Sequence, residues 1–420
     1  MKIAGIIAEY NPFHLGHAYQ IQALRERHGI DAVICAMSGH FMQRGEPAMI
    51  HKRTRTRMAL EQGADLVIEL PALYATRSAW WFAFGGVSLL HRTGIVTHLA
   101  FGAERDALPQ LRDAARVLAA EPPAFRAALS HALNDGVSFA RAQSQALKHI
   151  RPDLPPVIRP NERLALNYLQ IIESFSLPLT PVLIPRQGGG YHDPLPDAPG
   201  APGAAGIPGA SAIRRHLQSA PGYEEGLDQL RPFLPASSLR LLKEVLDQKK
   251  SFVFADDMAP ILMALLKRAS AADLAELPDM EPGLANRICA TARGSHDIAS
   301  FLDALKTKRY SRSRLQRLLT FLFLNYTQET AQFIGEGPPY LRILGFNSAG
   351  RQLLRQISRR GALPLITQGR QAKSLAWNHP AVKAAWSLDV RAGDLYALLE
   401  KAPSHPAGSA EYYETPCRLV

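Results

Sequence analysis

The chain has 420 residues, of which 47% are hydrophobic and 20% are charged, a balance typical of a globular protein with a sizeable core. Its three cysteines, Cys35, Cys289 and Cys417, form no CxxC pair, which excludes a disulfide framework and a thiolate zinc site. The formal net charge of +11 indicates a polyanionic partner, because cationic surfaces gain free energy when counterions leave a phosphate backbone. The longest apolar stretch, 66–90, is interrupted by charges and a proline, and no signal segment is evident, so we expect a cytoplasmic protein.

Short apolar runs alternate with longer amphipathic stretches over the first two hundred residues. Runs rich in Ile, Val and Leu predict strands at Ile3–Ala8, Ala32–Met37, Asp65–Leu70, His98–Phe101 and Pro181–Ile184. Helical patterns occupy residues 17–28, 52–62, 78–91, 107–120, 123–133 and 162–174. This alternation predicts a parallel sheet with right-handed crossovers, which binds ligands at the carboxyl ends of its strands.

The second half of the chain has a different character. Residues 186–210 are rich in Gly and Pro and predict a mobile loop, and from about residue 222 leucine- and alanine-rich helical patterns follow with few strand signals. We therefore expect an α/β fold: a Rossmann-like parallel-sheet domain over residues 1–220 and a mainly α-helical domain over residues 221–420.

The segment 11–17, NPFHLGH, is the strongest functional signal, since it lies between the first strand and the first helix. A helix N-terminus offers backbone N–H groups and a positive dipole end, and Gly16 allows a flat ring such as adenine to approach the backbone. His14 and His17 lie on the same side of the first turn, where both can donate to phosphate oxygens. Displacement at phosphorus depends mostly on positioning and charge stabilisation, so the pair predicts a nucleotide site.

Two other interpretations of the histidines stay open. An HxxH pair can bind a metal ion, although no third His, Cys or carboxylate lies nearby at a ligand spacing. The histidines could also be incidental turn residues, which their place between a strand and a helix disfavours.

The motif resembles the HxGH nucleotidyltransferase superfamily, which is related to class I aminoacyl-tRNA synthetases. Four further segments narrow the resemblance to the bacterial tRNA(Met) cytidine acetate ligase family: 38–48 (SGHFMQRGEPA), 64–71 (ADLVIELP), 101–104 (FGAE) and 340–347 (YLRILGFN). The resemblance covers nearly the whole chain, and the ordered set is far more specific than HxGH alone.

This resemblance implies an enzyme that activates acetate with ATP to give acetyl-adenylate and pyrophosphate. It then transfers the acetyl group to the N4 amine of the wobble cytidine of elongator tRNA(Met), giving N4-acetylcytidine. The chemistry is coherent, because a cytosine amine is a poor nucleophile and AMP is a good leaving group. ATP as co-substrate brings Mg²⁺ into consideration, although no dedicated carboxylate cage is evident.

By resemblance, His14 and His17 are the catalytic residues on the ATP phosphates. The same resemblance implies that ATP is bound by Ile7, Ala8, Glu9, Tyr10, Asn11, Pro12, Phe13, His14, Leu15, Gly16, His17, Ala18, Tyr19, Gln20, Gly102, Asn161, Arg186, Ser211 and Arg214. From the residues alone, Gly102 could equally be a turn glycine, Asn161 a helix N-cap and Arg186 a surface arginine.

Residues 207–214, IPGASAIR, resemble the superfamily's second phosphate box, but imperfectly. Ser211 can cap the helix and donate to a phosphate, and Arg214 can reach back toward it. Gly209 replaces the usual hydroxyl residue, which puts the role of that position in doubt. His40 is a second departure, because the family usually has Asn there.

The loop after the second strand carries Gln43, Arg44 and Glu46 at the same sheet edge as the HxGH turn. These residues are candidates for shaping the acetate and cytosine pocket, and a buried structural Arg–Glu pair is the alternative. We assign no general base.

Two basic runs are candidates for RNA binding, and residues 351–360 form a weaker third stripe. A charge run is usually a solvated face, but several runs in a chain with an adenylation motif favour tRNA, bound mainly through its phosphates. The candidates are Lys52, Arg53, Arg55 and Arg57 in the first run, and Lys306, Lys308, Arg309, Arg312, Arg314 and Arg317 in the second.

Two rival functions stay open. One is an adenylyltransferase that joins AMP to a phosphorylated metabolite, which the basic runs and the large helical half disfavour. The other is a non-catalytic ATP- and RNA-binding regulator, which the intact His14 and His17 disfavour.

Overall fold

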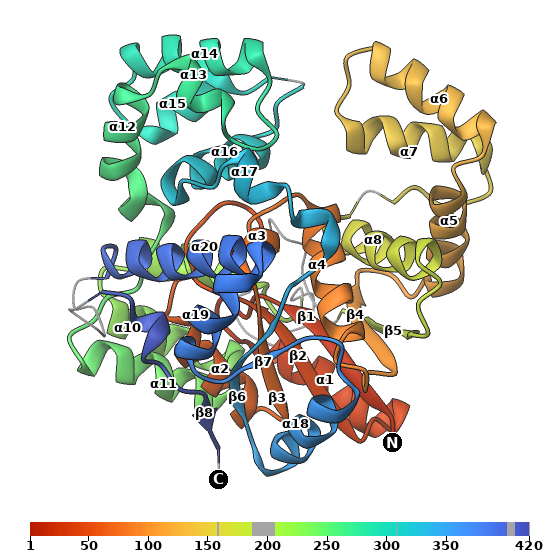
Figure 1. Ribbon diagram of the computed structural model, residues 1–420, viewed down its shortest axis with the longest axis vertical. Coiled ribbons are helices and arrows are strands. Elements are labelled where there is room, and N and C mark those ends of the chain that lie inside the picture. The colour runs from red at the N-terminus through yellow and green to blue at the C-terminus, as the bar shows by residue number, and fades with distance from the viewer. Residues whose placement is uncertain (158, 187–205, 308, 401–407, 420) are drawn as a thin grey trace.

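One sheet runs through the centre of the molecule, with helices on both of its faces (Figure 1). The computed structural model describes residues 1–157, 159–186, 206–307, 309–400 and 408–419. Within these residues the strand order is β5-β4-β1-β2-β3-β6-β7, with β8 paired to β6, and only β3 and β6 pair antiparallel. The strands are β1 (Ile3–Ala8), β2 (Ala32–Ser38), β3 (Leu66–Leu70), β4 (His98–Ala103), β5 (Thr180–Pro185), β6 (Leu341–Phe346), β7 (Leu365–Ile366) and β8 (Cys417–Arg418).

The helices of the first half mostly connect consecutive strands. They are α1 (Leu15–His28), α2 (Lys52–Glu61), α3 (Ala72–Ala75), α4 (Ala79–His91), α5 (Leu108–Ala120), α6 (Pro123–Asn134), α7 (Phe139–Ile150) and α8 (Pro160–Ser174). The later helices are α9 (Ala210–Ser219), α10 (Tyr223–Gln229), α11 (Ala236–Asp247), α12 (Ala259–Arg268), α13 (Ala271–Ala275), α14 (Pro282–Gly294), α15 (Ile298–Leu305), α16 (Arg312–Leu324), α17 (Gln328–Ala331), α18 (Ser348–Arg360), α19 (Gly369–Asn378) and α20 (Pro380–Ala397). No helix in the described part of the chain is long and apolar enough to cross a membrane.

The fold class expected from the sequence is confirmed. The five predicted strands correspond to β1–β5 and the six predicted helices to α1, α2, α4, α5, α6 and α8, each with bounds within two residues. Helix α7 was not predicted, and the C-terminal half adds three unpredicted strands, β6, β7 and β8, to the same sheet. The division near residue 220 stays a prediction. Residues 187–205 of the Gly/Pro-rich segment, and Lys308, lie outside the described residues.

Two apolar layers hold the sheet between its helices. Alternate residues of a strand point to opposite faces, so Ile34 belongs to one layer and Val33 to the other. The layer with Val33 includes Met58 of α2, and the layer with Ile34 includes Val87 of α4. Buried apolar side chains therefore cover both faces of the sheet and anchor its strands between the helices.

Two groups of helices, α12–α16 and the pair α6 and α7, stand apart from the sheet. Figure 1 shows α12–α15 at the upper left with α16 below them, and the pair α6 and α7 as a separate arm at the upper right. Helix α16 packs directly on the loop after β2, because an added Cβ at Gly45 would lie only 2.5 Å from the backbone of Gln316.

Candidate active site at the carboxyl edge of the sheet

A cavity of about 310 Å³ opens at the carboxyl ends of β1, β4 and β5. Parallel sheets bind ligands at this edge, and the volume suits a small-molecule site. The walls come from the turn between β1 and α1, the loop after β2, the start of α8 and the start of α9. Four segments that are distant in sequence therefore converge on one space.

His14 and His17 present a pair of donors at the cavity wall. His14 is the N-cap residue of α1, and its Nδ1 accepts a hydrogen bond from the backbone N–H of Gly16 at 3.0 Å. The Nδ1 of His17 accepts from the backbone N–H of His14 at 3.2 Å, and the two rings lie 3.8 Å apart. An accepting Nδ1 carries no proton, so this network assigns the proton of each neutral ring to Nε2.

This geometry corrects one detail of the sequence analysis. The N–H of Gly16 is already bonded to His14 and does not stay free for a ligand. The two imidazole Nε2–H groups are therefore the side-chain donors that the turn offers to an anion, and the positive end of the helix dipole adds an electrostatic attraction.

Both histidines are neutral at physiological pH. Burial lowers the pKa of His14 to about 3, and the positive charge of Arg186 contributes to that shift. Burial, followed by His14 and Arg186, holds the pKa of His17 well below its ordinary value. The cationic charge in this part of the cavity therefore comes from Arg186.

Arg186 follows β5 and extends beside Gly102 of β4. Its side chain is exposed to the cavity, the neighbouring protein atoms lower its pKa by partial desolvation, and Glu104 acts in the opposite direction. A Cβ on Gly102 would lie 3.4 Å from the Cγ of Arg186, which is an ordinary contact. Packing against the surrounding protein atoms therefore does not itself require glycine at this position.

Glu104 organises the start of α8, a role that sequence analysis missed. Its carboxylate accepts from the backbone N–H groups of Asn161 at 3.2 Å and Glu162 at 3.1 Å, and from the Nδ2 of Asn161 at 2.8 Å. The N-cap position itself is Arg159, so the N-cap interpretation of Asn161 is wrong. Glu104 satisfies the free end of α8 and fixes the Asn161 amide at the cavity wall.

The second phosphate box lies at the start of α9. Gly209 is the N-cap residue and Ser211 the second residue of the helix, so the prediction that Ser211 caps α9 is wrong, although Ser211 lines the cavity. Arg214 reaches back as expected: its Nη1 donates to the backbone oxygen of Asn11 at 2.8 Å, and its Nη2 pairs with Glu46. This arginine therefore joins α9 to the HxGH turn and to the loop after β2.

That loop is fixed against the end of β1. The backbone N–H of Gln43 donates to the Oε1 of Glu9 at 2.7 Å, and the Nε2 of Gln43 donates to the backbone oxygen of Arg77 at 3.0 Å. Burial raises the pKa of Glu9, while the bond from Gln43 acts in the opposite direction. Gln43, Arg44 and Glu46 all line the cavity, and the Arg–Glu pair of this region joins Glu46 to Arg214.

Most of the residues implied by the resemblance meet at this cavity. Those that line it are Ile7, Ala8, Glu9, Tyr10, Asn11, His14, Gly16, His17, Tyr19, Gln20, Gly102, Asn161, Arg186, Ser211 and Arg214. Pro12, Phe13, Leu15 and Ala18 do not line it, and Phe13 is fully buried in the core. Apolar lining residues that sequence analysis missed include Phe82, Phe101 and Tyr168, whose signal was only that of a core strand or helix.

The first basic run contradicts part of the RNA prediction. Lys52 is fully buried, and its Nζ lies 2.8 Å from Glu69 and 2.6 Å from Glu411. Arg55 is also fully buried and donates to the backbone oxygens of Ile50, Glu9, Ser38 and Gly39. Both cations therefore hold the fold together and cannot contact an RNA surface.

The other described members of the runs keep exposed or half-buried surface. Arg53 donates to the backbone oxygen of Thr415, and Arg57 pairs with Glu244. In the second run Lys306 is exposed, Arg309 and Arg314 pair with Glu281, and Arg312 pairs with Asp303. Arg317 is half-buried beside the loop after β2.

Known proteins resemble this chain in both sequence and fold. Residues 1–410 match the model of the HIGH Nucleotidyl Transferase family. The chain is 35% identical to the tRNA(Met) cytidine acetate ligase of Syntrophomonas wolfei, over 99% of each chain, and 35% identical to that of a Thermoanaerobacter species, over 96% and 97%. The crystal structure of Thermotoga maritima TmcAL bound with alpha-thio ATP covers 100% of both chains with a TM-score of 0.90 and 29% identity.

Proposed function

Because the chain belongs to the tRNA(Met) cytidine acetate ligase family of HIGH nucleotidyl transferases, we propose that it converts ATP and acetate to acetyl-adenylate and pyrophosphate, and then transfers the acetyl group to the wobble cytidine of elongator tRNA(Met) with release of AMP. The observation that carries the proposal is the convergence of two neutral imidazole donors and two arginines, Arg186 and Arg214, on one cavity at the sheet edge. With tRNA as acceptor, we expect the reaction to take place in the cytoplasm.

In the first half-reaction a carboxylate oxygen of acetate attacks the α-phosphorus of ATP, and the bond from that phosphorus to pyrophosphate breaks. Negative charge grows on the equatorial and leaving oxygens, so donors already in place there lower the barrier. The Nε2–H groups of His14 and His17 would act on the α-phosphate and the leaving oxygens, and the guanidinium groups would hold the departing pyrophosphate.

In the second half-reaction the N4 amine of cytidine attacks the acetyl carbonyl, and the bond from that carbon to the AMP oxygen breaks. The N4 proton leaves and AMP departs with an oxygen that came from acetate. Gln43, Arg44 and Glu46 would shape the entry of acetate and cytosine, because their loop forms the wall next to the HxGH turn.

The nucleotide would occupy the space between the HxGH turn and the start of α8. In this proposal the backbone at residues 7–11, Gly102 and Asn161 contact the nucleoside, while Arg186, Ser211 and Arg214 contact the phosphates. Among the described residues no three His, Cys, Asp or Glu side chains lie close enough to hold a metal ion. We therefore assign no residue to Mg²⁺, which ATP phosphates commonly carry with them.

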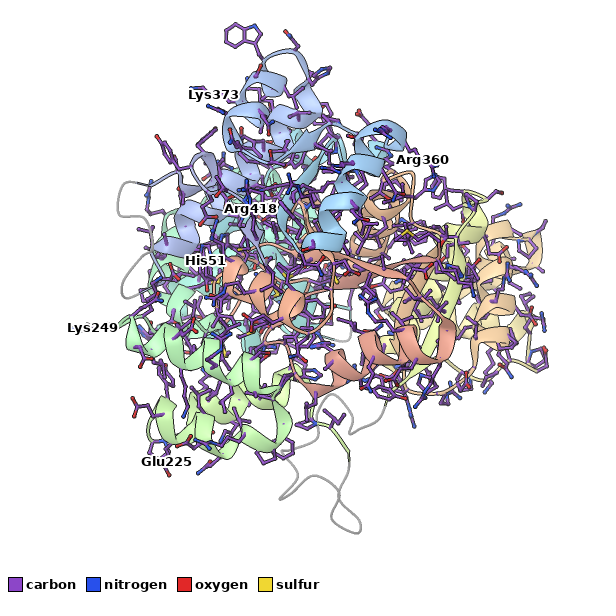
Figure 2. All side chains as sticks on the ribbon, turned by 90° about the horizontal axis from the view of Figure 1, so that it is seen from below. His51, Glu225, Lys249, Arg360, Lys373 and Arg418 are labelled. Atoms are coloured by element: carbon purple, nitrogen blue, oxygen red, sulfur yellow. The ribbon has the colours of Figure 1, made fainter. Side chains whose placement is uncertain are left out.

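For the RNA surface we retain the cations that keep exposed or half-buried surface. These are Arg53 and Arg57 of the first run and Lys306, Arg309, Arg312, Arg314 and Arg317 of the second. The third basic stripe lies elsewhere: α18 is at the opposite end of the molecule from α16 (Figure 1), and Arg360 points outward at its periphery (Figure 2). We leave that stripe out of the proposed surface.

Oxygen labelling tests the adenylate route. The protein is incubated with ATP, tRNA and acetate that carries ¹⁸O in both oxygens, and the AMP is analysed by mass spectrometry. The proposal predicts one ¹⁸O atom per AMP, because the bridging oxygen of acetyl-adenylate comes from acetate. Unlabelled AMP beside acetylated tRNA would exclude that intermediate.

A further inference from the structure

Arg317 of α16 lies where that helix meets the loop that lines the cavity. Gly45 of the loop, with φ of 79°, lies so near α16 that an added Cβ would come within 2.6 Å of the backbone nitrogen of Arg317. A side chain at residue 45 would therefore force the loop and the helix apart. This contact brings Arg317 near Arg44, whose side chain lines the cavity.

The guanidinium of Arg317 is a cation without a matched anion. Burial lowers its pKa to about 10; Asp279 opposes that shift, and Arg314, Arg77 and Arg44 add to it. It forms no hydrogen bond or ion pair with any residue that the structure describes. Its neighbours on the run differ, because Arg309, Arg312 and Arg314 each pair with a carboxylate.

Arg77 adds a second, independent observation at the same place. Its side chain is only 5% exposed, and its Nη2 lies 3.2 Å from the Oδ1 of Asp279. Its Nε and Nη1 atoms are buried and have no acceptor within the described part of the chain. Buried charged donors are normally hydrogen-bonded, because leaving them unmatched is unfavourable. Arg77 thus pairs with one carboxylate and lies over the rings of Phe321 and Tyr326, but two of its buried donors have no acceptor in the described part of the chain. The neighbouring guanidinium of Arg317 has none either.

We infer that Arg317, with Arg77 behind it, binds a phosphodiester group of the acceptor RNA next to the cytidine that enters the cavity. The inference rests on the proposed function, since a nucleotide whose base reaches the acetyl group carries its own phosphates to the mouth of the cavity. The planar fork of a guanidinium matches phosphate oxygens, and single-stranded RNA keeps those oxygens accessible. Arg317 is then a positioning residue for acetyl transfer, with no part in adenylation.

The test compares the variants Arg317→Ala and Arg317→Lys with the control Arg268→Ala. Arg268 is an exposed arginine at the end of α12 that does not line the cavity, so its replacement removes the same charge outside the site. Acetate-dependent exchange of pyrophosphate into ATP measures the first half-reaction. The KM for tRNA in acetylation, and the Kd for tRNA at several salt concentrations, measure the RNA contact.

We expect Arg317→Ala to raise the KM for tRNA about tenfold or more, as loss of a charged hydrogen bond does. It should reduce the slope of log Kd against log salt by about 0.7, the value for one phosphate on a single strand. Arg317→Lys should give an intermediate KM, because lysine keeps the positive charge but lacks the planar guanidinium that can bind two phosphate oxygens at once. Pyrophosphate exchange, and every value for Arg268→Ala, should match the wild type.

Two results would overturn the inference. An equal fall in pyrophosphate exchange and acetylation would assign Arg317 to the phosphates of ATP or to folding. An unchanged KM and salt slope for Arg317→Ala would show that it contacts no phosphate. If the wild type acetylated no RNA, the proposed function would fail, and the salt slopes of tRNA binding would still decide the inference separately.

Discussion

Replacement of His14 separates the two contributions of that residue, because its two ring nitrogens have different partners. The Nδ1 caps α1 through the N–H of Gly16, and loss of such a cap costs about 1 kcal/mol of folding free energy. The Nε2–H lies at the cavity wall, where loss of one donor to a charged transition state costs about 3–4 kcal/mol, or 10²–10³ in rate. His14→Ala should therefore lose both contributions, and most of the loss should be in rate.

His14→Asn provides the matched variant. Asparagine is a strong N-cap residue, so the free energy of unfolding in urea should return to within a few tenths of a kcal/mol of the wild type. Its shorter side chain cannot place a donor where the imidazole Nε2 lies, so acetate-dependent pyrophosphate exchange should stay about 10²-fold down or more. If His14→Asn restored exchange together with stability, His14 would be only a helix cap, and the catalytic assignment would be refuted.

Two further predictions concern buried groups beside the cavity. Lys52→Met should lower the free energy of unfolding by about 3–5 kcal/mol, because it leaves the two buried carboxylates of Glu69 and Glu411 with Arg342 as the one cation that pairs with both. A fully stable variant with weakened tRNA binding would instead return Lys52 to the RNA surface. Burial lowers the pKa of His40 to about 4. Between pH 6.5 and about 4 this histidine is therefore protonated in the unfolded chain and neutral in the folded chain. Stability should therefore fall as pH drops from 6.5 to about 4, and His40→Asn should remove up to about 3 kcal/mol of that loss in urea unfolding at pH 4; an unchanged pH profile would contradict the assigned burial.

The sequence predicted the first half of the fold well, because its strands and helices carry strong local patterns. β1–β5 are short apolar runs buried on both faces, and the HxGH turn lies at the expected junction. β6 was missed because its six residues follow a long helical region, and it becomes a strand through antiparallel pairing with β3, which no local pattern records.

The candidate site shows the same limit. The family resemblance identified Asn161, Arg186 and Arg214, and all three line the cavity. The hydrogen-bond partners of Asn161 and Arg214 could not be predicted, because they come from distant parts of the chain. Glu104 caps α8 from a different element, and Lys52 looks like a surface cation in sequence although two distant glutamates surround it. Charge runs predict exposure only on average, because burial of a cation depends on carboxylates that lie far away in the chain.

The most direct test of the central claim incubates the protein with ATP, acetate and unmodified elongator tRNA(Met), then digests the RNA and measures N4-acetylcytidine. Our account predicts N4-acetylcytidine at the wobble position, with one AMP released for each acetyl group, and its loss in the His17→Ala variant. A tRNA that stays unmodified while pyrophosphate forms would contradict the assignment of cytidine as the acceptor.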